Sequence, residues 1–250
     1  MIPTPRVAVL ITDGINCDME MSNAFEKAGG ASELVHINQL SEGEKKLADF
    51  AILAIPGGFS YGDDIASGAV LGNELVTQLG DEVREFASAG KPVLGVCNGF
   101  QVLVRAGILP EGRLGEQTAS LTQNEIGGFI CKWIELEVGY TACEFVKDLP
   151  QQIETIPMQI AHGEGKFVIG RDGYIQLLDN RQIAFRYKTN PNGSINRIAG
   201  ICDPSGLILG MMPHPERSIS SFHPDRTRTA QAKSSAETIF RNIVNYARES

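Results

Sequence analysis

The sequence predicts an α/β protein with a mainly parallel central sheet, flanking helices, and some antiparallel strands in the C-terminal half. Two observations carry this prediction. Short apolar runs, of the kind that are covered on both faces of a parallel sheet, alternate with helix-length stretches in the N-terminal half. From about residue 129 onward, strand-like segments follow one another, separated by turn signals such as "NPNGS". We therefore expect βαβ units first and a meander after them.

The N-terminal half contains the expected parallel strands and the helices that connect them. The strands are short and rich in β-branched residues. In the first helix Asp18 suits an N-cap and a glycine pair ends the run. In the second, apolar residues recur at helical spacing until Gly90. The strands are expected at 6–12, 51–55 and 91–96, and the helices at 18–30, 71–90 and 98–107.

The C-terminal half is expected to form further strands and one terminal helix. The segment 230–250 carries apolar residues three or four positions apart, which predicts an amphipathic helix packed on the sheet. These residues are Ala236, Ile239, Ile243 and Tyr246. The expected strands are "FICKWIELEV", "KFVI", "YIQLL", "IAFRYK" and "LILGMM".

Composition indicates a single globular domain over residues 1–250. Hydrophobic residues make up 42% of the chain and charged residues 21%, which is ordinary for a folded protein and argues against disorder or a fibrous repeat. No linker-like segment divides the chain. The formal net charge of -8 leaves no surplus of Lys and Arg for phosphates, so we expect no nucleic-acid partner.

The opening segment and the cysteines indicate a reducing cytoplasm. The apolar run in "MIPTPRVAVLITDG" is too short for a signal-peptide core or a membrane span, so we expect a cytoplasmic protein that does not bind membranes. The five cysteines lack CxxC spacing, which disfavours a disulfide framework and a structural zinc site. Cys17 is expected on the first turn of a helix, and packing roles are expected for Cys131, Cys143 and Cys202.

The fifth cysteine, Cys97 in "GVCNGFQ", lies between a predicted strand and a predicted helix. Ligands of open α/β sheets gather beyond the carboxyl ends of strands, and a sharp turn there holds a side chain toward that crevice. Gly95 and Gly99 relieve the crowding of such a turn, and the N–H groups that open the helix favour a thiolate. A small buried hydrophobe is the alternative, but the flanking glycines favour a nucleophile.

Two His-x-Glu segments are candidates for the base that a cysteine nucleophile needs, with a carboxylate to orient it. They are "HGEG" and "PHPER". In an extended segment, residues two apart point to the same side, so either segment can bring its carboxylate near its imidazole. Prolines on both sides of His214 restrict its backbone, so we favour His214 with Glu216 over His162 with Glu164. A surface ion pair or a loop hydrogen bond is the alternative for either pair.

The segment "IPGGFSYGDD", at 55–64, follows another strand end and is expected to contribute to an oxyanion hole. Its paired glycines allow a backbone N–H to point into the crevice. The second donor is expected to be the N–H of Asn98, directly after the nucleophile. A plain strand-to-helix turn is the alternative. The segment lacks the Lys-Ser or Lys-Thr of a phosphate loop, so no nucleotide site is expected in this chain.

Together these motifs resemble those of the class I glutamine amidotransferase family. The cysteine turn and the His-Pro-Glu segment mark the class, and the resemblance runs through most of the chain. Several motifs are similar to those of the glutaminase subunits that serve purine biosynthesis: "PGGFSYGDD", "GVCNGFQVLVRAGILP", "AHGEGKF" and "GMMPHPER". The segments "ITDGINCDME" and 218–235 depart from the family pattern.

The resemblance implies a Rossmann-like or flavodoxin-like fold and a set of residue roles. It assigns a nucleophile, a base with its orienting carboxylate, two backbone oxyanion donors and one substrate contact. In that order, these are Cys97, His214, Glu216, Gly58, Asn98 and Gln101. It leaves His162 and Glu164 without a role.

The resemblance also implies a complex. Glutamine would be hydrolysed to glutamate and ammonia through a cysteine thioester, and the ammonia would pass to a large synthetase subunit. That partner would bind ATP and Mg²⁺ and convert formylglycinamide ribonucleotide to formylglycinamidine ribonucleotide, with a small accessory subunit completing the assembly. This chain itself is expected to hold no cofactor and no metal. The alternatives are a stand-alone cysteine enzyme on the same kind of sheet and a scaffold subunit whose cysteine turn is inactive.

Overall fold

The strands form one large mixed sheet and a separate pair. The protein is described by a computed structural model that covers residues 3–63, 66–147, 149 and 155–250. The large sheet contains β1 Arg6–Ile11, β2 Ala31–His36, β3 Ile52–Ile55, β4 Val93–Val96, β6 Ile130–Val138, β7 Ile156–His162, β9 Ile183–Tyr187, β10 Ile198–Cys202 and β11 Ile208–Met211. The separate pair is β5 Ala119–Thr122 with β8 Lys166–Ile169.

The order of the large sheet is β2-β1-β3-β4-β11-β10-β9-β6-β7. The first five strands of this order are parallel, and the remaining four alternate in direction. The predicted fold class is therefore confirmed, including the antiparallel strands of the C-terminal half. Asp64, the last residue of the "IPGGFSYGDD" segment, lies outside the described residues.

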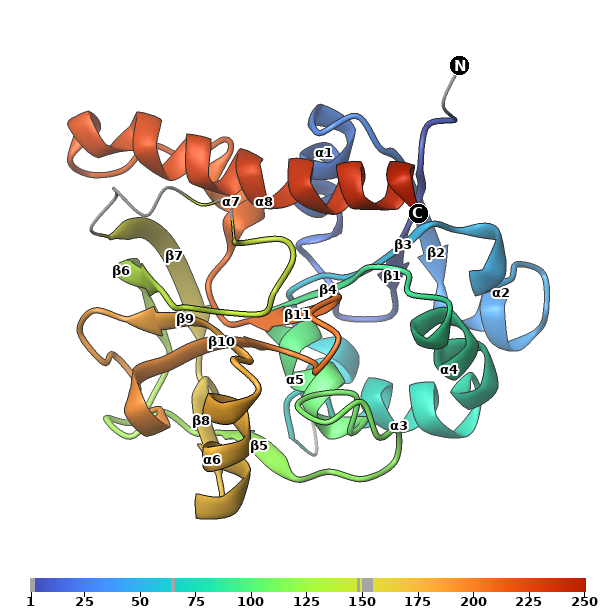
Figure 1. The fold of residues 1–250 in the computed structure, drawn as a ribbon, viewed down its shortest axis with the longest axis horizontal. Helices are drawn as coiled ribbons and strands as arrows, with labels where there is room; N and C mark the ends of the chain where they lie inside the picture. The colour runs from blue at the N-terminus through green and yellow to red at the C-terminus, as the bar shows by residue number, and fades with distance from the viewer. Residues whose placement is uncertain (1–2, 64–65, 148, 150–154) are drawn as a thin grey trace.

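Helices cover both faces of the sheet. Figure 1 shows α8 running along one face beside α1, with α3, α4 and α5 on the opposite face. The α-helices are α1 Asp18–Lys27, α2 Ile37–Ser41, α3 Ala69–Thr77, α4 Gly80–Ser88, α5 Asn98–Arg105, α6 Arg171–Asp179, α7 Pro215–Ser218 and α8 Thr229–Glu249. Single 3₁₀ turns occur at Leu47–Asp49, Ser60–Asp63, Ile195–Arg197 and Arg226–Arg228. Within the described residues, no helix is both long and apolar enough to cross a membrane.

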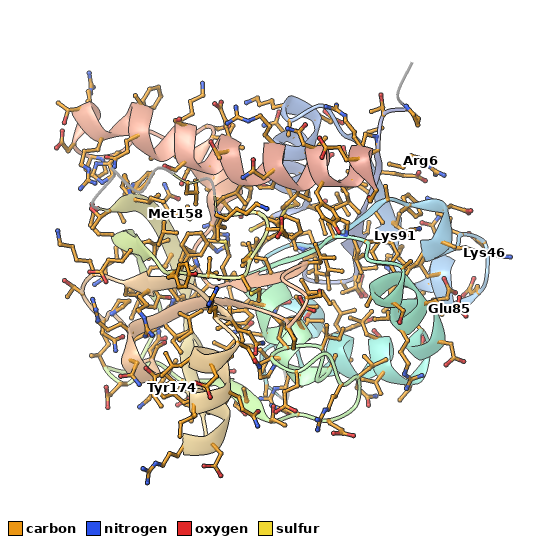
Figure 2. All side chains as sticks on the ribbon, viewed as in Figure 1. Arg6, Lys46, Glu85, Lys91, Met158 and Tyr174 are labelled. Atoms are coloured by element: carbon orange, nitrogen blue, oxygen red, sulfur yellow. The ribbon has the colours of Figure 1, made fainter. Side chains whose placement is uncertain are left out.

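The core lies between the sheet and these two helical layers. Met158 on β7 is fully buried inside the body of the molecule, whereas Lys46 is exposed at its periphery (Figure 2). The expected terminal helix, α8, buries Ala236, Ile239 and Ile243. Its packing on the protein body confirms the interpretation drawn from its spacing of apolar residues.

Most strands of the large sheet run in the same direction, so that their C-terminal ends meet at one edge. β9 and β7 run in the same direction as β11, because an even number of antiparallel pairings separates each of them from it. Open α/β sheets bind ligands at this carboxyl edge. At or just after the strand ends there lie Thr12, Gly57, Cys97, His162, Tyr187 and His214.

Two predicted elements differ from the structure. The expected helix at 71–90 is split into α3 and α4, with Leu79 in a non-helical conformation before Gly80, a weak helix former. The expected strand "YIQLL" is part of α6. A five-residue segment with four apolar residues fits either period, and Ile175 and Leu178 are 43% and 46% exposed, as residues on an outer helical face are.

The cysteine predictions are mostly confirmed. Cys143 and Cys202 are fully buried, as expected for packing residues. The prediction for Cys131 is wrong, because this residue lies on an outward-facing position of β6 and is exposed. Cys17 directly precedes α1 and is buried.

Candidate active site

The turn that carries Cys97 is sharp and positions the sulfur at the carboxyl edge. Cys97 joins β4 to α5 with φ 53° and ψ -105°, a conformation that L-residues rarely adopt. A Cβ at Gly99 would lie 1.9 Å from the carbonyl oxygen of Ile55, and one at Gly95 would lie 2.7 Å from the carbonyl oxygen of Gly99. Both glycines are therefore needed for α5 to approach the strands this closely.

The segment after β11 brings an imidazole and a carboxylate together in the interior. His214 is extended at φ -102° and ψ 90°, Pro215 opens α7, and Glu216 lies in the first helical turn. Nδ1 of His214 and Oε1 of Glu216 are 2.5 Å apart, and both side chains are buried. The pair thus forms through a helix N-terminus rather than through the fully extended segment that we expected. The N–H of His214 donates to the carbonyl of Gln159 at 2.8 Å, which ties the segment to β7.

The imidazole of His214 and the side chain of Cys97 meet over Gly57. A Cβ at Gly57 would stand 2.8 Å from Cε1 of His214 and 3.4 Å from Cβ of Cys97, so a larger residue would occupy this space. Burial opposes protonation of His214, but the Glu216 carboxylate and the Cys97 sulfur outweigh it and hold the pKa of His214 well above its usual value. An imidazolium beside a sulfur stabilises a thiolate.

The glycine-rich segment pairs with the loop after β1. The N–H of Phe59 donates to the carbonyl of Gly14 at 2.9 Å, and the N–H of Asn16 donates to that of Gly57 at 3.4 Å. Between these two bonds Gly58 occupies a non-hydrogen-bonded position, so its N–H points away from the partner loop. A Cβ at Gly58 would lie 2.7 Å from Cα of Ile15, and its φ of +151° also favours glycine.

Asn98 and Gln101 occupy the first turn of α5, directly after Cys97. Both side chains are buried, and Nδ2 of Asn98 donates to Oε1 of Gln101 at 3.0 Å. Oδ1 of Asn98 accepts from the N–H of Ser60 at 3.3 Å, which links α5 to the glycine-rich segment. Nε2 of Gln101 donates to the carbonyl of Glu164 at 2.6 Å. The expected substrate contact therefore also supports the "HGEG" turn.

The second His-x-Glu segment does not form a pair. Nδ1 of His162 lies 3.0 Å from Oδ1 of Asn124, whereas Oε2 of Glu164 accepts from the N–H of Ser67 at 3.1 Å. Burial, followed by repulsion from His214, lowers the pKa of His162 to about 4. An imidazole that stays neutral at physiological pH and lacks a carboxylate partner does not fit the role of base as well as His214 does.

Sequence reasoning missed the side chains that support this site. Nη2 of Arg217 donates to Sγ of Cys17 at 3.1 Å, which links α7 to the start of α1. Asn124, in a segment without any recognised motif, is buried and contacts His162. No local pattern marks Asn124, whereas Arg217 belongs to the quoted "PHPER" segment.

In the described part of the chain, one group of side chains is close enough to hold a metal ion. Ligand atoms of Cys17, His214 and Glu216 lie within 4.8 Å of one another. However, His214 and Glu216 bind each other, and the guanidinium of Arg217 already contacts the sulfur of Cys17. This donor set suits proton transfer better than it suits a cation.

The chain is similar to several known proteins over nearly its whole length. Residues 4–247 match the model of the CobB/CobQ-like glutamine amidotransferase domain. The chain is 40% identical over 268 residues to the phosphoribosylformylglycinamidine synthase subunit PurQ of Methanococcus maripaludis, covering 97% of each chain. It is 40% identical over 256 residues to the PurQ subunit of Dehalococcoides mccartyi, covering 98% of each. The solved structure of PurLQS from Thermotoga maritima contains a chain that superposes with a TM-score of 0.78 at 33% identity, covering 98% of this chain and 99% of that one.

Proposed function

The chain belongs to the CobB/CobQ-like glutamine amidotransferase family, and from this premise we propose that it is the glutaminase subunit of a phosphoribosylformylglycinamidine synthase. It hydrolyses glutamine to glutamate and ammonia for purine biosynthesis. The observation that carries the proposal is the meeting of Cys97 with the His214–Glu216 pair at the carboxyl edge of the sheet. A sulfur nucleophile, a buried base and a carboxylate that orients the base are the parts that amide hydrolysis through a thioester needs.

In the proposed reaction Cys97 attacks the carboxamide carbon of glutamine. The N–H groups of Gly58 and Asn98 stabilise the oxyanion of the tetrahedral intermediate, and Gln101 seats the substrate. His214 then gives its proton to the leaving nitrogen, so that ammonia departs and a glutamyl thioester remains on Cys97. Water, deprotonated by His214, attacks the thioester and releases glutamate.

The ammonia is consumed by a partner. Free ammonia becomes ammonium near neutral pH and is no longer a nucleophile, so the reaction serves synthesis only where a synthetase subunit receives it in a shielded path. The large synthetase subunit and a small accessory subunit are the proposed partners, as the name PurLQS describes for the Thermotoga maritima assembly. ATP and Mg²⁺ act in the synthetase subunit, while this chain works without a cofactor, in the cytoplasm.

The direct test is a glutaminase assay on the purified chain, alone and with the synthetase subunits, ATP and formylglycinamide ribonucleotide. We expect a large stimulation in the complex and its loss in Cys97→Ala. A glutamine-analogue diazoketone should label Cys97 in competition with glutamine. Labelling that ignores glutamine would indicate a general thiol enzyme instead, and the absence of both labelling and turnover would indicate a scaffold subunit.

A further inference from the structure

The buried residue Asn124 makes several hydrogen bonds to the "HGEG" turn at the end of β7. Nδ2 of Asn124 donates to the carbonyl of His162 at 2.9 Å and to that of Gly128 at 3.0 Å. Oδ1 of Asn124 accepts from the N–H of Gly165 at 3.1 Å, and its backbone N–H donates to the carbonyl of Gly163 at 2.9 Å. Three of the four residues in the turn are therefore held by Asn124, and Gln101 holds the fourth through the carbonyl of Glu164.

These bonds determine the tautomer of His162. Because two carbonyl groups accept from Nδ2 of Asn124 and a backbone N–H donates to its Oδ1, the orientation of the amide is fixed. The Nδ1 atom of His162, 3.0 Å from Oδ1, must then carry the proton and donate. The low pKa of His162 keeps the ring neutral, so Nε2 presents a lone pair.

That lone pair is buried without a partner. Nε2 of His162 makes no hydrogen bond with any described protein group, although the side chain is only 3% exposed. Buried polar atoms are nearly always satisfied, and an exception calls for a ligand or an ordered water. The ring packs closely on Gly165, where a Cβ would be 2.2 Å from its Cε1 and 2.6 Å from its Nε2.

The segment that carries His162 lies next to the reacting cysteine. The carbonyl of Ala161, the preceding residue, is 3.5 Å from Sγ of Cys97. Repulsion from His214 is the second cause, after burial, of the low pKa of His162. A substrate bound to Cys97 would therefore have its reacting carboxamide beside this segment.

We propose that Nε2 of His162 accepts a hydrogen bond from the carboxamide N–H of glutamine, and that Asn124 is the positioning residue that sets the required tautomer. The inference rests on the proposed glutaminase function. A carboxamide supplies the N–H donor that the lone pair lacks, whereas the carboxylate of glutamate would set negatively charged oxygen against it. The contact thus selects glutamine over glutamate and aids release of the product.

The test compares two substrates in the assembled synthetase complex, with glutamate release as the readout. L-glutamine has the N–H group, whereas L-glutamate γ-methyl ester offers the same acyl carbon with an oxygen leaving group and no N–H. For His162→Ala we expect kcat/KM to fall about tenfold or more with glutamine, the size of one lost buried hydrogen bond, and to change less than about threefold with the ester. His162→Gln, whose amide oxygen replaces the acceptor, should recover part of the glutamine activity.

Two controls separate this role from a structural one. Asn124→Ala should, like His162→Ala, lower kcat/KM more with glutamine than with the ester. His223→Ala should leave kcat/KM unchanged with both substrates, because His223 lies in the 218–235 segment, where its ring packs on Trp133. Equal losses with both substrates, or no loss with glutamine, would overturn the inference. If the wild-type complex hydrolyses neither substrate, the proposed function fails, and the inference fails with it.

Discussion

The residue at position 99 determines how closely α5 approaches the central strands. An alanine there would put its Cβ 1.9 Å from the carbonyl oxygen of Ile55, a backbone atom that cannot swing aside. We expect Gly99→Ala to lower the free energy of unfolding by about 3 kcal/mol or more, as overpacking against backbone does. Denaturant unfolding measures this.

The matched control for that substitution is Gly80→Ala. Gly80 begins α4, and a Cβ there would be 3.6 Å from its nearest neighbour, which is ordinary contact. Alanine is a better helix former than glycine, so the free energy of unfolding of Gly80→Ala should stay within about 1 kcal/mol of the wild-type value or rise. Similar destabilisation by both substitutions would show that contact with Ile55 is not the cause.

His162 makes stability depend on pH in a predictable direction. Its pKa is about 4 in the folded protein against 6.5 as the reference value, so the unfolded chain binds more protons between these limits. The stabilisation from keeping this ring neutral is complete above pH 6.5 and is lost as the pH falls toward 4, by about 3 kcal/mol in total. Unfolding free energies measured from pH 7 to pH 4.5 should therefore fall less steeply in His162→Gln than in the wild type. Parallel curves would contradict this.

At the scale of elements, the terminal helix α8 holds the N-terminal α1 in place. The rings of Phe240 and Phe25 meet edge to face with centroids 5.0 Å apart, and both are buried. We expect Phe240→Ala to cost about 3–5 kcal/mol of stability, because it leaves a cavity between the two helices.

The same chain offers an exposed phenylalanine as the control. Phe222, in the segment before α8, is 79% exposed, so Phe222→Ala should change the melting temperature very little. Thermal unfolding of the two variants side by side checks the difference. Comparable shifts would mean that α8 is not anchored through Phe240.

At the scale of the whole molecule, the site lies at one edge of the sheet and its product must reach a partner. We expect that, in the complete complex with ATP and glutamine labelled with ¹⁵N in its amide, nearly all of the label enters the amidine even when unlabelled ammonium is in excess. Mass spectrometry of the product measures this. The chain without its synthetase should instead release ammonia that mixes with the solvent pool, and dilution of the label in the complex would rule out a shielded path.

Local patterns in the sequence determined much of the fold and the identity of the central residues. Apolar runs and their periods predicted the parallel strands and α8, because an element buried on one or both faces needs apolar residues at regular positions along the chain. The glycines around Cys97 and the prolines around His214 likewise marked turns whose backbone needs those residues. Four apolar residues in the five-residue segment "YIQLL" did not suffice, since a run of that length fits a strand or a helical face.

Only the tertiary structure decided which groups meet. The bonds from Asn124 to the "HGEG" turn, from Arg217 to Cys17, and from Ser67 to Glu164 all join distant parts of the chain. Whether His162 or His214 has a carboxylate partner also followed from those contacts and not from the shared His-x-Glu spacing. The physical reason is that spacing along a chain constrains only neighbouring residues, whereas hydrogen bonds and desolvation depend on which strands the sheet brings to the same edge.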